Sequence, residues 1–203
     1  MKNKLGLVLI LVLSLLVVGC SNNTASNENV STEADMTVEQ VTLDAPIAEQ
    51  PLVLTSAGQS ADVKMIESLI KKTDIPYTID TVLNADDLGD AKTLIIAIGG
   101  SSKGLGAAGI DTDEEIDRVT TLIAKAKEND MTIIGMHVGG EGRRGELSDK
   151  FVNATVGSVD YLVYVESGNY DNLLTDLASD NNIPAESVES IAGSLEALQK
   201  AFK

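Results

Sequence analysis

Residues 93–98 read Thr-Leu-Ile-Ile-Ala-Ile, and Gly99, Gly100 and Ser101 follow directly. An apolar run of six residues without polar alternation is typical of a strand that is covered on both faces, as in a parallel sheet. Residues 52–55, 131–138 and 161–165 form three more such runs. Residues 75–83 predict a fifth strand, and Pro76 favours a sheet edge for it because proline lacks a backbone donor.

Helical periods separate these runs, which indicates strands and helices that alternate along the chain. A capping box is expected at Thr112 and Glu115, and a short helix between residues 85 and 91. Pro184 is expected to open the last helix. The apolar positions of the five longer helices are Val63, Ile66, Leu69 and Ile70; Ile116, Val119, Ile123 and Ala126; Leu147, Phe151 and Ala154; Leu173, Leu174 and Leu177; and Val188, Ile191, Leu195 and Phe202.

Right-handed crossovers and an edge position for the second strand then give one arrangement. The sequence predicts a three-layer α/β domain around a five-stranded parallel sheet of order 2-1-3-4-5. This is a flavodoxin-like, or Rossmann-like, topology.

The N-terminus has the order of a secretory signal: Lys2 and Lys4, an apolar stretch over residues 5–18, and small residues before Cys20. Val17-Val18-Gly19-Cys20 resembles the lipobox of bacterial lipoproteins, which implies a diacylglycerol on the Cys20 sulfur and removal of residues 1–19. The stretch is short for a membrane-spanning helix, which remains an alternative. A buried structural role for Cys20 is the alternative to its lipidation. A lipid on Cys20 would anchor the protein to the cell membrane, so the predicted location is the outer face of that membrane.

Residues 20–50 are rich in Ser, Asn, Thr and Glu and predict a disordered tether, followed by one domain over residues 51–203. The formal net charge of the chain is −16, from 15 basic and 31 acidic residues. Removal of residues 1–19 takes two basic and no acidic residues, so 13 minus 31 gives −18. Such a charge argues against nucleic acid as a partner. A single cysteine excludes an intrachain disulfide and a thiolate metal cluster.

Three polar loops follow strands that should end at the same edge, where open parallel sheets bind ligands. The first loop leads into the start of a helix, so its free backbone N–H groups suit an anion. Simple capping of that helix by Ser60 explains the loop equally well. Loop glycines and serines offer backbone donors, and arginine binds carboxylate or phosphate bidentately. The candidate ligand-binding residues are Ser56, Gly58, Gln59 and Ser60; Gly99, Gly100, Ser101, Ser102 and Lys103; and His137, Gly139, Gly140, Glu141, Arg143 and Arg144. Residues 166–168 are expected to complete the pocket.

Plainer interpretations stand beside these. His137 is the only histidine, and a strand-end residue with satisfied hydrogen bonds explains it better than a proton-transfer role does. Arg143 and Arg144 also suit ion pairs with surface acids. Gly104, Gly106 and Gly109 match G-x-G-x-x-G only in spacing, because they do not join a strand directly to a helix. The acids from Asp111 to Glu115 suit the first turn of a helix, so no metal and no cofactor is predicted.

The sequences Gly99-Gly100-Ser101-Ser102-Lys103-Gly104-Leu105-Gly106-Ala107-Ala108-Gly109-Ile110-Asp111 and His137-x-Gly139-Gly140-Glu141-Gly142-Arg143-Arg144-Gly145 resemble a bacterial family known only as a domain of unknown function. The resemblance runs from about Pro51 to the C-terminus. It implies an exported α/β domain with these loops, and it implies no activity.

Three functions are compatible with this pattern. The first is a tethered module that binds a small anionic ligand, because three polar loops converge on one sheet edge. The second is a hydrolase that uses His137 with a loop serine such as Ser101. No G-x-S-x-G motif in the sequence supports this second function. The third is an accessory domain that docks on a membrane transporter or sensor. The sequence favours binding over catalysis.

Overall fold

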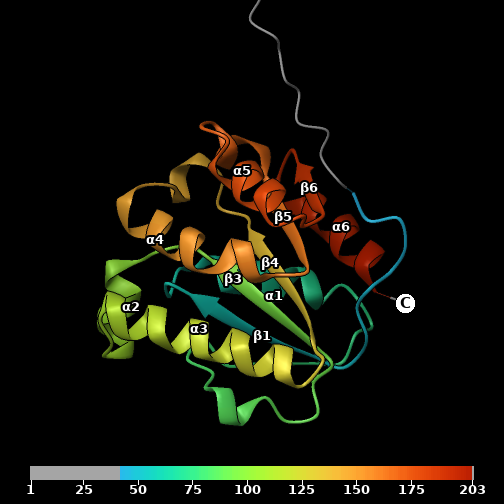
Figure 1. The fold of residues 1–203 in the computed structure, drawn as a ribbon, viewed down its shortest axis with the longest axis horizontal. Helices are drawn as coiled ribbons and strands as arrows, with labels where there is room; N and C mark the ends of the chain where they lie inside the picture. Colours follow the sequence, from blue (N-terminus) through green and yellow to red (C-terminus); the bar gives the residue numbers. More distant parts are fainter. Residues whose placement is uncertain (1–41, 203) are drawn as a thin grey trace, which may run out of the picture. The chain divides into compact units, whose positions relative to one another are not determined.

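The computed structural model describes residues 42–202, which contain a six-stranded, wholly parallel sheet of order β2-β1-β3-β4-β5-β6 (Figure 1). The first five strands have the predicted order. Their in-register pairs include Leu54 with Ile95 and Ile95 with Ile134. The strands are β1 (Leu52–Ala57), β2 (Tyr77–Ile79), β3 (Thr93–Ile98), β4 (Thr132–His137), β5 (Tyr161–Val165) and β6 (Ala185–Val188).

The sixth strand corrects the sequence prediction, which placed the start of a helix at Pro184. Instead, β6 extends the sheet beside β5, and the Pro184 carbonyl accepts a hydrogen bond from the Leu162 amide at 3.0 Å. A proline directly before an edge strand removes no ladder donor. Val188, which was assigned to the buried face of the last helix, is therefore a strand residue.

Helices cover both faces of the sheet, and the sheet separates the core into two layers. Helices α1 (Asp62–Ile70) and α6 (Ser194–Ala201) lie on one face, where Ile66 and Leu198 contact buried side chains such as Ile95. Helices α3 (Thr112–Glu128), α4 (Glu146–Thr155) and α5 (Leu173–Asp180) lie on the other face. The 3-10 turns are η1 (Ala85–Asp87), η2 (Glu141–Arg143), η3 (Val156–Ser158), η4 (Glu166–Asn169) and η5 (Ile191–Gly193).

Two helix starts differ from the prediction. Residues 102–108, expected within a glycine-rich loop, form the short helix α2 (Ser102–Ala108), which buries Leu105 against the core. The capping box of α3 lies one residue earlier than expected. Asp111 accepts hydrogen bonds from the second and third residues of the helix, and the Glu114 side chain accepts one from the Asp111 amide. Asp accepts such bonds as well as Thr does, so the sequence pattern left the register ambiguous.

Residues 43–49, which were assigned to the end of the tether, pack on the domain. The Ile47 and Ala48 amides donate to the Ala201 carbonyl at 3.0 and 2.7 Å, and Ala48 bridges Phe202. The Thr93 hydroxyl donates to the Glu49 carbonyl at 2.7 Å. The predicted signal peptide, Cys20 and most of the predicted tether lie outside the described residues. Within residues 42–202, no helix is both long and apolar enough to cross a bilayer.

Candidate functional site

The glycine loops after β3 and β4 emerge side by side and pack directly on each other. A Cβ atom on Gly99 would lie 2.8 Å from the Arg143 side chain. One on Gly100 would lie 2.8 Å from Leu147, and the Gly100 amide donates to the Ser148 hydroxyl at 2.9 Å. The two loops therefore meet at the carboxyl edge of the sheet, with protein atoms filling the space between Gly99 and Arg143.

The loop after β1 is closed by a carboxylate from α3. Glu115 is fully buried, and its Oε1 atom accepts hydrogen bonds from the Gly58 amide and from Gln59 Nε2, both at 2.9 Å. Arg118 donates to the same carboxylate at 2.7 Å and to the Ser56 carbonyl. The donors of Gly58 and Gln59, which were predicted to bind an anionic ligand, are thus used by Glu115, 57 and 56 positions further along the chain.

The other residues proposed for the first two loops have local roles. Ser60 is buried, and its hydroxyl accepts a hydrogen bond from the Asp62 amide at 3.3 Å. Ser101 is the N-cap of α2 and accepts from the Gly104 amide at 3.1 Å. Ser102 and Lys103 are exposed in the first turn of that helix. None of these residues is among those that line the depression over the carboxyl ends of β4, β5 and β6.

Arg143 forms a half-buried ion pair. Its Nε atom donates to both oxygens of Asp62 at 3.2 and 3.1 Å, and the Asp62 side chain is almost fully buried at the start of α1. The aliphatic part of Arg143 packs on Gly139, where a Cβ atom would overlap it. Its charge is balanced by Asp62, so Arg143 supplies little net positive charge to this edge.

Arg144 is a structural centre of the region. Its side chain is 1% exposed, and it donates to Asp149 at 2.7 Å, to Asp171 at 2.9 and 3.0 Å and to the Gly168 carbonyl. Its guanidinium also lies 5.0 Å from the centre of the Tyr170 ring. Burial disfavours the charge, but the bonds to Asp171 and Asp149 outweigh it and raise the pKa of Arg144. Because Arg144 is engaged in this way, it is not a free counter-ion.

His137 ends β4 and is fully buried. Its Nδ1 atom lies 3.1 Å from the Ile98 carbonyl, which can only accept, so Nδ1 carries the proton in the neutral ring. Nε2 has no hydrogen-bond partner of acceptable geometry within residues 42–202. Burial lowers the pKa of His137 below its ordinary 6.5, against the opposing effects of the Ile98 and Gly140 carbonyls and of Asp62. No hydrogen bond of the described residues joins His137 to a serine, so no nucleophile and base are paired here.

The lowered pKa of His137 predicts a stability loss in weak acid. Between the folded pKa and 6.5 the unfolded chain binds more protons than the folded one, so stability present above pH 6.5 is lost as the pH falls. The loss is at most about 1.4 kcal/mol per pH unit. Urea unfolding of the full-length chain at several values from pH 7.5 to 5 should show this slope, and His137→Asn should flatten it. Equal slopes in the two proteins would contradict the assignment.

A depression of about 360 Å³ lies over the carboxyl ends of β4, β5 and β6. Its apolar part comes from Val138 and Val165 at the strand ends and from Ile191 and Ala192 in η5. Gly139, Gly140, Ser167 and Ser190 complete the lining. A Cβ atom on Gly140 would lie 2.5 Å from the Ser167 hydroxyl, so glycine at 140 permits the close approach of η2 and η4.

Several donors in this lining are unused. The backbone N–H groups of Gly139, Gly140, Ile191 and Ala192 donate to no acceptor in the described part of the chain. The Ser190 hydroxyl makes no hydrogen bond there either, and Ser167 accepts only a long one of 3.4 Å from the Glu141 amide. Backbone donors gathered around a concave surface can hold an anionic group without a formal positive charge.

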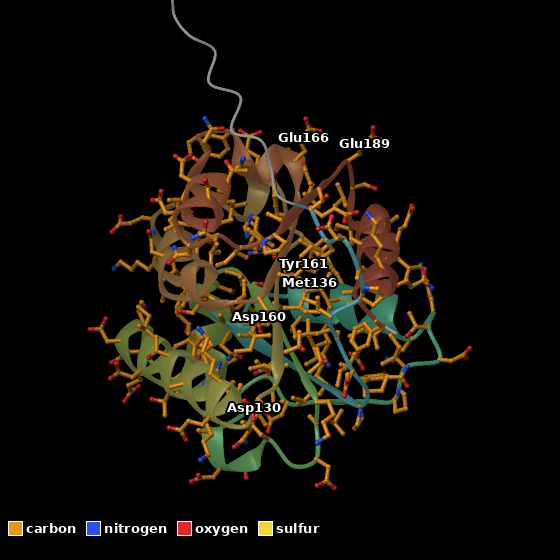
Figure 2. All side chains as sticks on the ribbon, turned by 45° about the vertical axis from the view of Figure 1, so that its right-hand side comes forward. Asp130, Met136, Asp160, Tyr161, Glu166 and Glu189 are labelled. Carbon is orange, nitrogen blue, oxygen red and sulfur yellow. The ribbon has the colours of Figure 1, made fainter. Side chains whose placement is uncertain are left out.

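Three exposed glutamates flank the segments that line the depression. Glu141 follows Gly140, Glu166 precedes Ser167, and Glu189 precedes Ser190. Figure 2 shows Glu166 and Glu189 at the same end of the molecule, with their side chains directed outward. Within residues 42–202 none of the three forms an ion pair. The rim is therefore negative, while the lining itself carries no charged side chain.

Three residues of this lining were named in the sequence analysis. Gly139 and Gly140 were predicted to bind a ligand, and Ser167 was expected to complete the pocket; that they bind a ligand stays a prediction. Ser190, Ile191 and Ala192 were missed because they were assigned to a long final helix. Residues 185–188 read Ala-Glu-Ser-Val, without the alternation of apolar and polar residues typical of a strand, so the sequence carried no clear signal that this helix starts later.

A family model described as "Domain of unknown function (DUF6305)" matches residues 49–202. Among curated proteins, no sequence matches the chain. The esterase EstA from Pseudoalteromonas sp. is a similar solved structure, with 10% identity, a TM-score of 0.33 and coverage of 68% of this chain and 78% of the esterase. A putative acylhydrolase from Bacteroides fragilis has 11% identity, a TM-score of 0.35 and coverage of 81% of this chain and 78% of the acylhydrolase. Likeness at this level carries no argument about activity.

Proposed function

We propose that this chain, which belongs to the DUF6305 family, binds a small solute through an anionic group of that solute. The proposed site is the depression over the carboxyl ends of β4, β5 and β6. The observation that carries this proposal is the set of unused donors in the lining, namely four backbone N–H groups and the Ser190 hydroxyl. Apolar walls with a few convergent polar groups are the usual composition of a small-molecule site.

The proposed site lies at the carboxyl edge of the sheet but away from the loop after β1. The donors of that loop already bind an anionic group, the carboxylate of Glu115 on α3. Arg143 and Arg144 are engaged with Asp62 and with Asp149 and Asp171. The backbone of Gly139 and Gly140, and not an arginine, is therefore the proposed anion contact in the loop after β4.

Blocking the depression tests this function. Ala192 is exposed in η5, so Ala192→Trp should obstruct the site with little effect on folding. Isovalerate, valine and inorganic phosphate serve as probes that each carry an anionic group. At least one should shift the amide resonances of Gly139, Gly140, Ile191 and Ala192 in ¹⁵N-labelled full-length protein.

The matched control is Ala124→Trp on α3, an exposed position that does not line the depression. Binding should persist in that variant and disappear in Ala192→Trp. If no probe moves these four resonances, or if Ala192→Trp binds as the unmodified chain does, the proposed function is wrong.

We also propose that the chain is exported and anchored by lipid on Cys20 at the outer face of the cell membrane. The support is the order of basic, apolar and small residues over positions 1–20. Labelled palmitate should enter the chain in bacterial cells and should be absent from a Cys20→Ala variant. Equal labelling of the two proteins would rule out Cys20 as the acceptor.

A further inference from the structure

The charge around the depression differs from that of an ordinary anion site. The lining contains no Lys or Arg, and the nearby Arg143 is neutralised by Asp62. A dianion such as phosphate would bring two negative charges to a surface that has no compensating cation, in a chain of net charge −16. A ligand with a single carboxylate matches the unused amide donors better.

The glutamate rim, formed by Glu141, Glu166 and Glu189, adds a requirement of the opposite sign. These three side chains are exposed and lack ion-pair partners in the described chain. They repel a simple carboxylate that approaches the depression and attract a positive group at its mouth. Their effect extends over about one Debye length, ~8–10 Å, which is comparable to the width of such a site.

The remaining surface is aliphatic. Val138, Val165, Ile191 and Ala192 offer branched or small side chains, and no aromatic ring lines the depression. Contacts of this kind favour a hydrocarbon group and offer no stacking partner for a planar ring. The volume of about 360 Å³ falls at the small end of the range for small-molecule sites.

From these three features together, and resting on the proposed function, we infer that the ligand is a short aliphatic α-amino acid in its zwitterionic form. Its carboxylate is held by the N–H groups of Gly139, Gly140, Ile191 and Ala192. Its ammonium group faces the glutamate rim, and its side chain lies on Val138 and Val165. A neutral zwitterion avoids the net repulsion that a carboxylate alone experiences.

Valine, isovalerate and isobutylamine separate the contributions, because they share an isobutyl or isopropyl group and differ in charge. Calorimetric or NMR titration of the full-length chain should give the tightest Kd for valine. The triple variant Glu141→Gln, Glu166→Gln, Glu189→Gln should weaken valine and strengthen isovalerate, each by roughly three- to ten-fold, as expected for three screened surface charges. The variant Asp86→Asn, Asp90→Asn, Asp130→Asn makes the same change in charge at exposed positions that do not line the depression, and it should change neither Kd by much.

The outcomes are distinct. If isovalerate or phosphate binds at these amides as tightly as valine, or if the triple glutamine variant moves valine and isovalerate in the same direction, the amino-acid assignment is wrong while anion binding stands. If none of the probes shifts the four amides, both proposals fail. Isobutylamine binding as tightly as valine would remove the carboxylate contact and therefore also count against both.

Discussion

Replacing Glu115 by alanine is expected to lower the free energy of unfolding by about 3–5 kcal/mol, the cost typical of breaking a buried ion pair. Glu115 is fully buried, and four donor atoms from Gly58, Gln59 and Arg118 converge on its carboxylate. Without it, the Gly58 amide and the Arg118 guanidinium lose a buried acceptor, and the desolvation cost of both groups remains. Urea unfolding of the full-length chain measures the effect.

A second ion pair on the same helix provides the control. Glu128 pairs with Lys125 at 2.9 Å, but the Lys125 and Glu128 side chains are 42% and 67% exposed. Glu128→Ala should therefore change the free energy of unfolding by less than about 1 kcal/mol. Similar losses in the Glu115 and Glu128 variants would show that the contact of α3 with the loop after β1 does not stabilise the fold.

Gly58→Ala is the second large expected effect, a loss of about 2–5 kcal/mol from backbone strain together with overpacking. Gly58 has φ = 97°, a backbone angle that residues other than glycine rarely adopt. A Cβ atom there would also lie 2.5 Å from Phe151, 2.6 Å from the Gly99 carbonyl and 2.9 Å from Gly100 Cα. Since two of these three contacts are backbone atoms, rotation of one side chain cannot relieve the overlap.

Gly106→Ala separates this mechanism from a general effect of adding a methyl group. Gly106 lies inside α2, and a Cβ atom there would meet nothing within 4 Å. Alanine is a better helix former by about 0.5–1 kcal/mol, so this variant should be slightly more stable than the unmodified chain. Thermal or urea unfolding of the two alanine variants side by side should show changes of opposite sign. Two losses of equal size would contradict the role given to Gly58.

The fold could largely be predicted because its signals are local. Apolar runs such as residues 93–98 and 161–165 indicate buried parallel strands, and the stripe of Val63, Ile66 and Ile70 indicates the helix between the first two strands. The sixth strand was missed because residues 185–188 are short and mixed in polarity, and because Pro184 suits both a helix start and an edge strand.

The candidate site was harder to predict because its parts depend on contacts between distant residues. The sequence indicated correctly that the loops after β3 and β4 are neighbours, since strands adjacent in a parallel sheet end at the same edge. It did not indicate which polar groups in those loops are already used. Arg144 is an example, because its partners Gly168 and Asp171 belong to a segment that follows the next strand.

The amino-acid sequence by itself determined a parallel α/β sheet with its first five strands in order, because hydrophobic periodicity is a property of neighbouring residues. Only the tertiary structure decided which donors remain open. Glu115 reaches across 57 residues to close the loop after β1, whereas Gly139, Gly140 and Ala192 retain N–H groups without an acceptor in the described chain. The physical reason is that a hydrogen bond is satisfied by whichever group the completed fold brings within about 3 Å, and sequence spacing carries no record of that distance.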